Sequence, residues 1–446
     1  MSDTSTPIIA IIGGAVAGSE AALIAAERGA HAVVIDQNAR PYGKIEDGLP
    51  RWHVGLRDKE YGRIDQNLDR PGVTFVPLTR VGRDISWQAL TKDLGFSAVI
   101  LANGAWRDRP LPVDGIDVLI GQGFAYQNPF VYWFNHNEDP DYNGTRFDIA
   151  DEAVVIGGGL ASIDVVKIIN YELYKAALAS RGVTFDAETF DKKGIPAICE
   201  AAGIDWRELG IKGATLYYRR RPEDMPLVSA DPGDTSRLAK LAQTRMRILE
   251  KAVEKFCINF VPLASPLSVL TEDDGQGGQR VSGMTFQRNT MVDGKLVSTP
   301  GDTFEVKTSS VFSSIGSIPA VVEGLPMKDE LYQWRDWDGG QLDDGEHVFG
   351  LGNVLTGKGN IVESRKNSKK IMDLVTRNVL GFSEETTAVT ATEAVRDAAE
   401  QTVVAALTDP KVADADAVHA WIKARHDAVG FQSYGTWIEA HRPLAH

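Results

Sequence analysis

Cysteine is scarce in this sequence, and its scarcity excludes several kinds of redox site. The 446 residues include only two cysteines, Cys199 and Cys257, which lie far apart and form no CxxC pair. A redox-active disulfide, a structural zinc site and a protein-ligated iron–sulfur cluster all need more thiolates or closer ones. We therefore expect no metal site, and any electron transfer must use a bound organic cofactor.

Long apolar runs and an excess of basic charge are also absent. The N-terminal segment lacks the basic region of a signal peptide, and glycines interrupt the apolar run that follows it. No other stretch is long and apolar enough to cross a bilayer. We expect a cytoplasmic protein without membrane contact, and the net charge of −14 argues against a nucleic-acid partner.

The first 36 residues have the pattern of a strand–helix–strand unit. The β-branched run Ile8–Ile12 precedes a glycine turn, and the segment Ser19–Arg28 is helical in composition. A second apolar run, Ala32–Ile35, ends at Asp36. This order predicts one unit of a dinucleotide-binding fold.

The same pattern returns about 140 residues later. It consists of the apolar run Glu152–Ile156, a glycine turn, the helical segment Ile163–Ile169 and a later strand, Ala214–Tyr218. Because each unit offers one pyrophosphate site, the repeat predicts two nucleotide-binding domains.

Three strand-to-glycine segments indicate how the two domains are connected. Residues 97–104 and 310–316 are typical of points where the chain leaves one domain for the other, and residues 348–353 of a late strand that returns to the first. We therefore predict an α/β protein with two Rossmann-like dinucleotide-binding domains, the second inserted in the first. The expected boundaries are 1–144 and 326–380 for the first domain, 145–325 for the second, and 381–446 for a helical C-terminal appendage.

The first glycine turn has the residues that a dinucleotide pyrophosphate needs. Gly13 makes the tight turn, Gly18 allows close packing of helix on strand, and Ala15 stands where the middle glycine is usual. The carboxylate of Asp36, at the end of the next strand, is placed to accept hydrogen bonds from an adenosine ribose.

The second turn predicts a nicotinamide nucleotide. Gly157 and Gly159 form the turn, and Ser162 replaces the last glycine. The following strand ends in Arg219 and Arg220 rather than in a carboxylate, and guanidinium groups suit a 2′-phosphate, so NADPH is favoured over NADH. A solvated run of surface charge is the alternative interpretation of these arginines.

Several further motifs make the resemblance more specific. They are Pro41–Gly43, Gly48–Pro50 with His53, Ile163–Ile168, Tyr218–Arg220 with Met225–Pro226, Thr356–Val362 and Arg365–Ser368. The chain resembles the adrenodoxin-reductase type of ferredoxin–NADP reductase and is also similar to the glutamate synthase small subunit. Both belong to the two-dinucleotide-domain flavoprotein superfamily, which has a glutathione-reductase-like fold. The likeness covers residues 8–375, and a weaker similarity extends to residues 434–437.

The resemblance implies FAD in the first domain and NADPH in the second. It places along the flavin, or at the turns that hold it, the residues Gly43, Leu49, Gly104, Gly352, Asn353, Gly359, Asn360 and Ile361. His53 is the one candidate catalytic residue, near the flavin and with an acidic partner such as Asp234, although a purely structural histidine is the alternative. Hydride transfer from nicotinamide to flavin needs stacking and exclusion of water rather than a protein acid.

The implied activity is reduction of FAD by NADPH, followed by single-electron transfer to a ferredoxin-like iron–sulfur protein. One alternative is a partner-bound NADPH-oxidising subunit like that of glutamate synthase, although its cysteine-rich N-terminal region is missing. Another is a flavin-binding scaffold with little turnover.

A basic stripe is the expected docking surface for that partner. Arg237, Lys240, Arg247 and Lys251 fall on one face of a predicted helix over residues 237–256, while its apolar residues gather on another. An acidic ferredoxin would be attracted to such a stripe. Solvation of an exposed helix face is the alternative.

Overall fold

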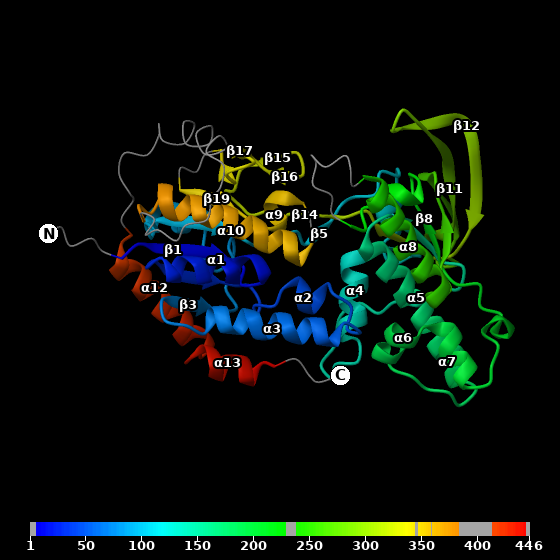
Figure 1. The fold of residues 1–446 in the computed structure, drawn as a ribbon, viewed down its shortest axis with the longest axis horizontal. Coiled ribbons are helices and arrows are strands. Elements are labelled where there is room, and N and C mark those ends of the chain that lie inside the picture. The colour runs from blue at the N-terminus through cyan, green and yellow to red at the C-terminus, as the bar shows by residue number, and fades with distance from the viewer. Residues whose placement is uncertain (1–5, 229–237, 344–346, 358, 383–412, 443–446) are drawn as a thin grey trace. The chain divides into compact units, whose positions relative to one another are not determined.

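The computed structural model describes residues 6–228, 238–343, 347–357, 359–382 and 413–442. Contacts divide the chain into two units (Figure 1). Unit 1 contains residues 1–45, 55–107 and 318–446, and unit 2 contains residues 46–54 and 108–317. The chain crosses between the units at 45/46 and 54/55, and again within the short strands β5 (Arg107–Asp108) and β14 (Ser317–Ile318).

Unit 1 is built on a mixed sheet of seven strands among the described residues, in the order β17-β18-β19-β4-β1-β2-β3. The strands are β1 (Ile8–Ile12), β2 (His31–Ile35), β3 (Val73–Val76), β4 (Ala98–Leu101), β17 (Trp334–Asp336), β18 (Gln341–Leu342) and β19 (Val348–Gly350). The five from β19 to β3 run parallel, and every residue of the central strand β1 is buried. Near-continuous Ile, Val and Ala runs suit strands that are covered on both faces.

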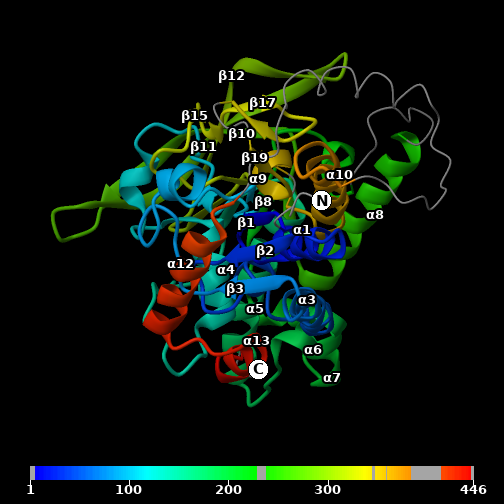
Figure 2. The ribbon, with the colours of Figure 1, turned by 90° about the vertical axis from the view of Figure 1, so that its left-hand side faces the viewer.

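Helices α1 and α10 lie side by side in unit 1, and the C-terminal helices α12 and α13 lie near the edge strand β3 (Figures 1 and 2). The helical elements of this unit are α1 (Val16–Glu27), α3 (Val54–Leu68), a π-helical turn (Ala89–Asp93), α9 (Asn353–Thr356), α10 (Ile361–Asn378), α12 (Ala415–Val429) and α13 (Tyr434–Ala440), and the short helix α2 (Lys44–Asp47) begins at its boundary. A small ladder pairs β15 (Met327–Lys328) with β16 (Leu331–Tyr332).

Unit 2 has a fully parallel sheet in the order β6-β13-β7-β8-β9. Its strands are β6 (Phe124–Tyr126), β7 (Val154–Gly157), β8 (Thr215–Tyr217), β9 (Asn259–Val261) and β13 (Val311–Ser314). Its α-helices are α4 (Gln127–His136), α5 (Leu160–Ala179), α6 (Ala187–Lys193), α7 (Ile195–Ala201) and α8 (Leu238–Phe256), with 3₁₀ turns at Ile116–Leu119, Trp206–Leu209 and Pro222–Asp224.

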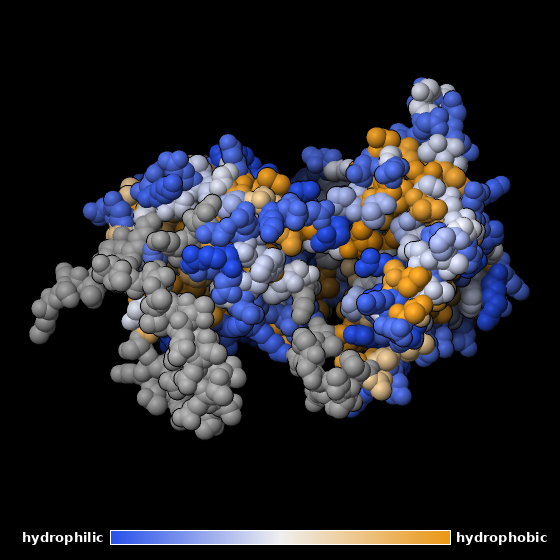
Figure 3. Space-filling view, turned by 90° about the horizontal axis from the view of Figure 1, so that it is seen from above, coloured by the Kyte–Doolittle hydropathy of each residue, from blue (hydrophilic) through white to orange (hydrophobic). Residues whose placement is uncertain are grey.

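An antiparallel sheet of β10 (Ala264–Asp273), β11 (Gln279–Val292) and β12 (Lys295–Lys307) also belongs to unit 2. The hairpin of β11 and β12 projects from this unit, and its surface is largely hydrophilic on the face shown in Figure 3. The fold therefore agrees with the predicted α/β class, with a helical C-terminal region.

The division of the chain differs from the expected boundaries at three segments. Residues 46–54, expected in the first domain, belong to unit 2, and residues 318–325, expected in the second domain, belong to unit 1. Residues 108–144, expected in the first domain, belong to unit 2 because β6 pairs with β13 and α4 packs on α5. The crossings at 107/108 and 317/318 lie close to the two strand-to-glycine segments that ended at Gly104 and Gly316. Within the described residues, no helix is long and apolar enough to cross a membrane.

Candidate dinucleotide-binding sites

The first glycine turn closes on itself too tightly for any side chain at two positions. Gly13 has φ +97, and a Cβ there would lie 2.7 Å from the Ala102 carbonyl oxygen. A Cβ on Gly18 would lie only 1.8 Å from the Gly13 carbonyl oxygen. These contacts hold α1 close behind β1, as the sequence predicted, and direct the helix N-terminus at the carboxyl edge of the sheet.

The N-terminus of α1 has no acceptor of its own. Ala15 is its N-cap and offers no side-chain hydrogen bond, and the first turn contains no acidic residue. The backbone N–H groups at a helix start carry partial positive charge and need acceptors. This terminus therefore suits an anion such as a pyrophosphate.

Asp36 lies at the end of β2, beside the turn, and is 7% exposed. Its Oδ2 accepts a hydrogen bond from the Gly14 N–H at 2.8 Å, and its Oδ1 accepts one from the Asn38 N–H at 2.9 Å. These bonds orient the carboxylate at the edge of the glycine turn.

Two asparagine side chains at the same sheet edge hold buried amide oxygens without a hydrogen-bond partner among the described residues: Asn103 after β4, and Asn353 after β19. The Asn103 Nδ2 donates to the Tyr332 hydroxyl at 2.8 Å, which fixes the amide. A buried acceptor without a partner is costly, and it often marks a place that a ligand completes. Asn103 was not predicted from the sequence, although its position directly after a strand was the available signal.

The segment that follows β19 is held against α1. Gly352 has φ +70, a Cβ there would lie 2.6 Å from the Ala17 Cβ, and its N–H donates to Asn367 Oδ1 at 2.6 Å. Gly359 lies beside the Asn353 amide, since a Cβ on it would be 3.7 Å from Nδ2. The Asn360 side chain caps α10 by accepting from the Val362 N–H at 2.8 Å. Ile361 is the half-buried first residue of that helix.

The other expected flavin-side residues divide between the units. Gly43 belongs to unit 1, where a Cβ on it would lie 2.9 Å from the Ala15 Cβ. Gly104, with φ +67, follows β4 in the same unit. Leu49 and His53 belong to unit 2, so they share a unit with the second glycine turn rather than with the first.

The second glycine turn is packed as closely as the first. A Cβ on Gly157 would lie 2.5 Å from the Ser314 carbonyl oxygen, and one on Gly158 only 2.1 Å from the Tyr218 ring. The Ser162 hydroxyl donates to the Gly159 carbonyl at 2.6 Å and stays within the turn. Gly159 caps α5 without a side-chain acceptor, so this helix N-terminus also suits a phosphate.

The three arginines after β8 have different partners. Arg221 is bound by Asp224 at 3.1 Å and Glu223 at 3.2 Å. Arg220 lies 3.7 Å from the Asp224 carboxylate and donates to the Gly294 carbonyl at 3.2 Å. Arg219 is exposed and forms no ion pair with the described residues. Of the two arginines predicted to bind phosphate, Arg219 is thus the more available.

His53 lies in a polar cluster of unit 2. The Trp52 Nε1–H donates to its Nε2 at 3.1 Å, and its charge interacts with Asp164. Burial raises the pKa of Asp164, while Lys167 and His53 oppose this shift. The predicted partner Asp234 lies outside the described residues.

Lys167 completes this cluster and was not identified from the sequence. Its ammonium is buried 2.7 Å from Asp191 Oδ1 and lies 4.4 Å from the Trp52 ring centre. These contacts hold the Trp52 ring next to His53, and they thereby fix the orientation of the His53 ring. No group of three or more potential metal ligands occurs among the described residues.

Comparison with known proteins identifies relatives over more than two thirds of the chain, although no protein-family model matches. NADPH:adrenodoxin oxidoreductase of Arabidopsis thaliana is 27% identical over 355 residues, which cover 73% of this chain and 71% of the plant protein. The NADPH glutamate synthase small chain of Mycobacterium tuberculosis is 25% identical over 332 residues, which cover 71% of this chain but only 54% of that protein.

A solved structure extends the likeness to the fold. FprA of Mycobacterium tuberculosis, in complex with NADPH, superposes with a TM-score of 0.65 at 19% identity, over 95% of this chain and 91% of that one. The predicted resemblance is thereby confirmed. The chain is similar in sequence to an NADPH:adrenodoxin oxidoreductase and to a glutamate synthase small chain, and it shares the fold of FprA.

Proposed function

We propose that this chain is an FAD-dependent enzyme that oxidises NADPH and delivers electrons singly to a ferredoxin-type iron–sulfur protein. The observation that carries the proposal is the presence of two glycine turns, one in each unit, each leading into a helix whose N-terminus has no side-chain acceptor. The NADPH oxidoreductases among the relatives support the activity.

The residues of unit 1 fit FAD. The N–H groups of the first turn of α1 would hold its pyrophosphate, and Asp36 its adenosine ribose. The amide oxygens of Asn103 and Asn353, which have no hydrogen-bond partner among the described residues, would accept from hydroxyl groups of the same cofactor. We propose that Gly43, Gly104, Gly352, Gly359, Asn360 and Ile361 line the cofactor through their backbone. When bound, FAD converts the two-electron chemistry of a nicotinamide into one-electron steps.

The residues of unit 2 fit NADPH. Gly157, Gly159 and Ser162 would hold its pyrophosphate at the start of α5, and Arg219, with Arg220 in support, its 2′-phosphate. We propose that Leu49 and His53 contact the bound cofactors. Hydrogen-bonded by Trp52, His53 has a positioning role in this scheme, since hydride transfer requires no protein acid.

Docking of an acidic partner is proposed at α8. Lys240, Arg247 and Lys251 are exposed on this helix, and Arg237 lies outside the described residues. Glu250 and Glu254 are also exposed on this helix, so acidic side chains lie among the basic ones. Charge of this kind accelerates encounter and is screened by salt.

Charge reversal tests the docking surface. Arg247→Glu with Lys251→Glu should slow ferredoxin-dependent cytochrome c reduction about tenfold at low ionic strength, because steering changes association rates by about 10- to 1000-fold. The deficit should vanish as salt rises, and ferricyanide reduction by NADPH should not change. The matched control reverses two exposed lysines on β12, Lys295→Glu with Lys307→Glu. Equal slowing in both variants would exclude α8 as the docking site.

A partner-bound electron-transfer subunit is the second candidate. The similarity to the glutamate synthase small chain favours it. Size exclusion of the native protein in lysate separates the two candidates, since a free enzyme elutes at its own mass and a subunit elutes with its partner.

We propose the cytoplasm as the compartment, because both cysteines are free thiols.

A further inference from the structure

The loop that follows β2, residues 36–43, lies directly against the first glycine turn; we call it the ribose loop. It contains bends and turns but no helix or strand. A Cβ on Gly14 would lie 2.7 Å from the Pro41 Cβ, and one on Gly43 would lie 2.9 Å from the Ala15 Cβ. Any movement of this loop therefore moves Asp36 and one wall of the turn.

The opposite side of the ribose loop is bound by the C-terminal appendage. The Trp437 Nε1–H donates to the Ala39 carbonyl at 2.7 Å, and the Arg40 guanidinium donates to the His441 carbonyl at 2.7 Å. Trp437 is 7% exposed and stacks on the His441 ring at 4.1 Å. Two backbone carbonyls, one on each partner, are thus satisfied across this contact.

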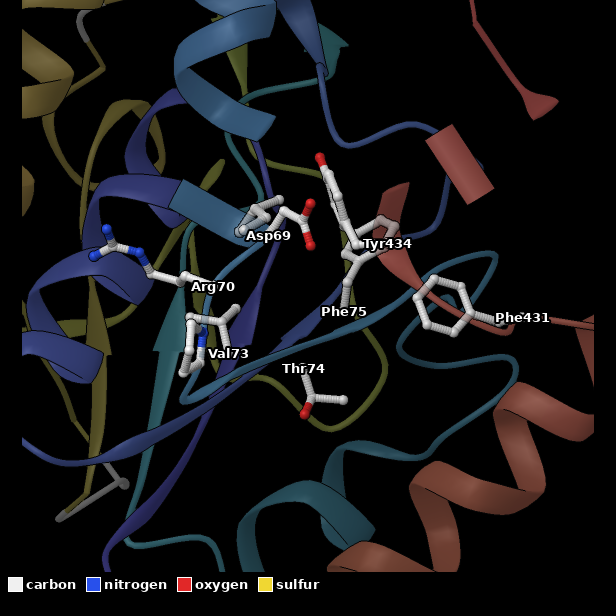
Figure 4. Close-up of a pocket in the computed structure, with 9 residues that line it drawn as sticks. Asp69, Arg70, Val73, Thr74, Phe75, Phe431 and Tyr434 are labelled. Carbon is white, nitrogen blue, oxygen red and sulfur yellow. The ribbon is translucent and has the colours of Figure 1, made fainter. Parts of the chain in front are cut away.

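A second contact anchors the same appendage. The Tyr434 hydroxyl donates to Asp65 Oδ1 at 2.7 Å, and the Tyr42 hydroxyl, at the end of the ribose loop, donates to the same oxygen at 3.1 Å. Figure 4 shows Tyr434 and Phe431 beside Phe75 of the edge strand. The Phe75 and Tyr434 rings meet edge to face at 5.4 Å. The appendage is therefore joined both to the sheet and to the loop.

We propose that helix α13 is part of the FAD site, and that Trp437 is a positioning residue that holds the ribose loop, and through it Asp36, in the conformation that binds the adenosine half of FAD. This inference rests on the proposed function. A loop without regular secondary structure depends on such external hydrogen bonds for its conformation. Loss of one bond should loosen the loop while the buried sheet beneath it stays intact.

The test replaces Trp437 with phenylalanine, which keeps an aromatic ring and removes the N–H donor. The dissociation constant of FAD, measured by fluorescence quenching on the apoprotein, should rise about fivefold, as expected for one hydrogen bond. With FAD in excess, kcat should return to the wild-type value. Trp421→Phe is the matched control, because Trp421 belongs to α12, packs against the core and makes no described bond to the ribose loop. It should leave the constant unchanged.

The outcomes separate this inference from the proposed function. If wild-type apoprotein binds no FAD, the proposed function fails. If it binds FAD and Trp437→Phe binds as tightly as Trp421→Phe, the appendage does not position the loop. A loss of kcat that excess FAD does not restore would also overturn the inference. Should Trp437→Phe fail to fold by circular dichroism, Tyr434→Phe removes one hydroxyl instead and should weaken FAD binding in the same direction.

Discussion

Replacing Gly18 with alanine should yield a folded protein that is purified without flavin. The added Cβ would lie 1.8 Å from the Gly13 carbonyl oxygen, and that oxygen belongs to backbone that cannot rotate away. Helix α1 must then shift off β1, which moves its N–H groups out of line with the pyrophosphate. We expect the dissociation constant of FAD to rise about 100-fold, or ~2.7 kcal/mol. Absorbance at 450 nm relative to 280 nm measures the retained flavin.

Gly55→Ala is the matched control for this variant. Gly55 lies in α3 of the same unit, and a Cβ there meets nothing within 4 Å. Alanine in an exposed helix is favoured over glycine by about 1 kcal/mol, so this protein should be yellow and slightly more stable. A Gly18→Ala protein with full FAD content would show that the first turn does not hold the cofactor.

Replacing Arg219 with alanine should reduce kcat/KM for NADPH by about 10- to 100-fold and change that for NADH less than about twofold. Only NADPH carries the 2′-phosphate, and Arg219 is exposed with no ion pair among the described residues to occupy it. Steady-state rates with ferricyanide as acceptor measure both nucleotides under one condition.

Arg221→Ala is the corresponding control, because Asp224 and Glu223 already hold this guanidinium. It should affect the two nucleotides equally and weakly. If Arg219→Ala also affects NADPH and NADH equally, the arginines are a solvated surface run and the preference for NADPH has another origin.

The parts of the fold that depend on local sequence were predictable. The run Ile8–Ile12, its glycine turn and Asp36 are neighbours in sequence, and β-branched residues, tight turns and a strand-end carboxylate each have a local physical cause. The second strand–turn–helix pattern was predictable by the same reasoning. The helical composition of the C-terminal region likewise led to α12 and α13.

Features that depend on long-range pairing were not predictable. Residues 108–144 join unit 2 because β6 pairs with β13, almost 190 residues later in the chain. Asn103 became a candidate only because its amide oxygen is buried without a hydrogen-bond partner in the part of the chain that the structure describes. The different availability of Arg219 and Arg221 depends on where Asp224 lies in the structure. Composition indicated that the C-terminal residues pack, but not that Trp437 binds Ala39.

The most direct test of the account is anaerobic mixing of the purified yellow protein with NADPH in a stopped-flow spectrometer. Hydride transfer to bound FAD should bleach the 450 nm band within the time of a single turnover, and NADH at the same concentration should bleach it more slowly. This result would also exclude a flavin-binding scaffold without turnover. A flavin band that NADPH leaves unchanged, in a protein with full FAD content, would contradict the central claim that this chain is an NADPH-oxidising flavoprotein.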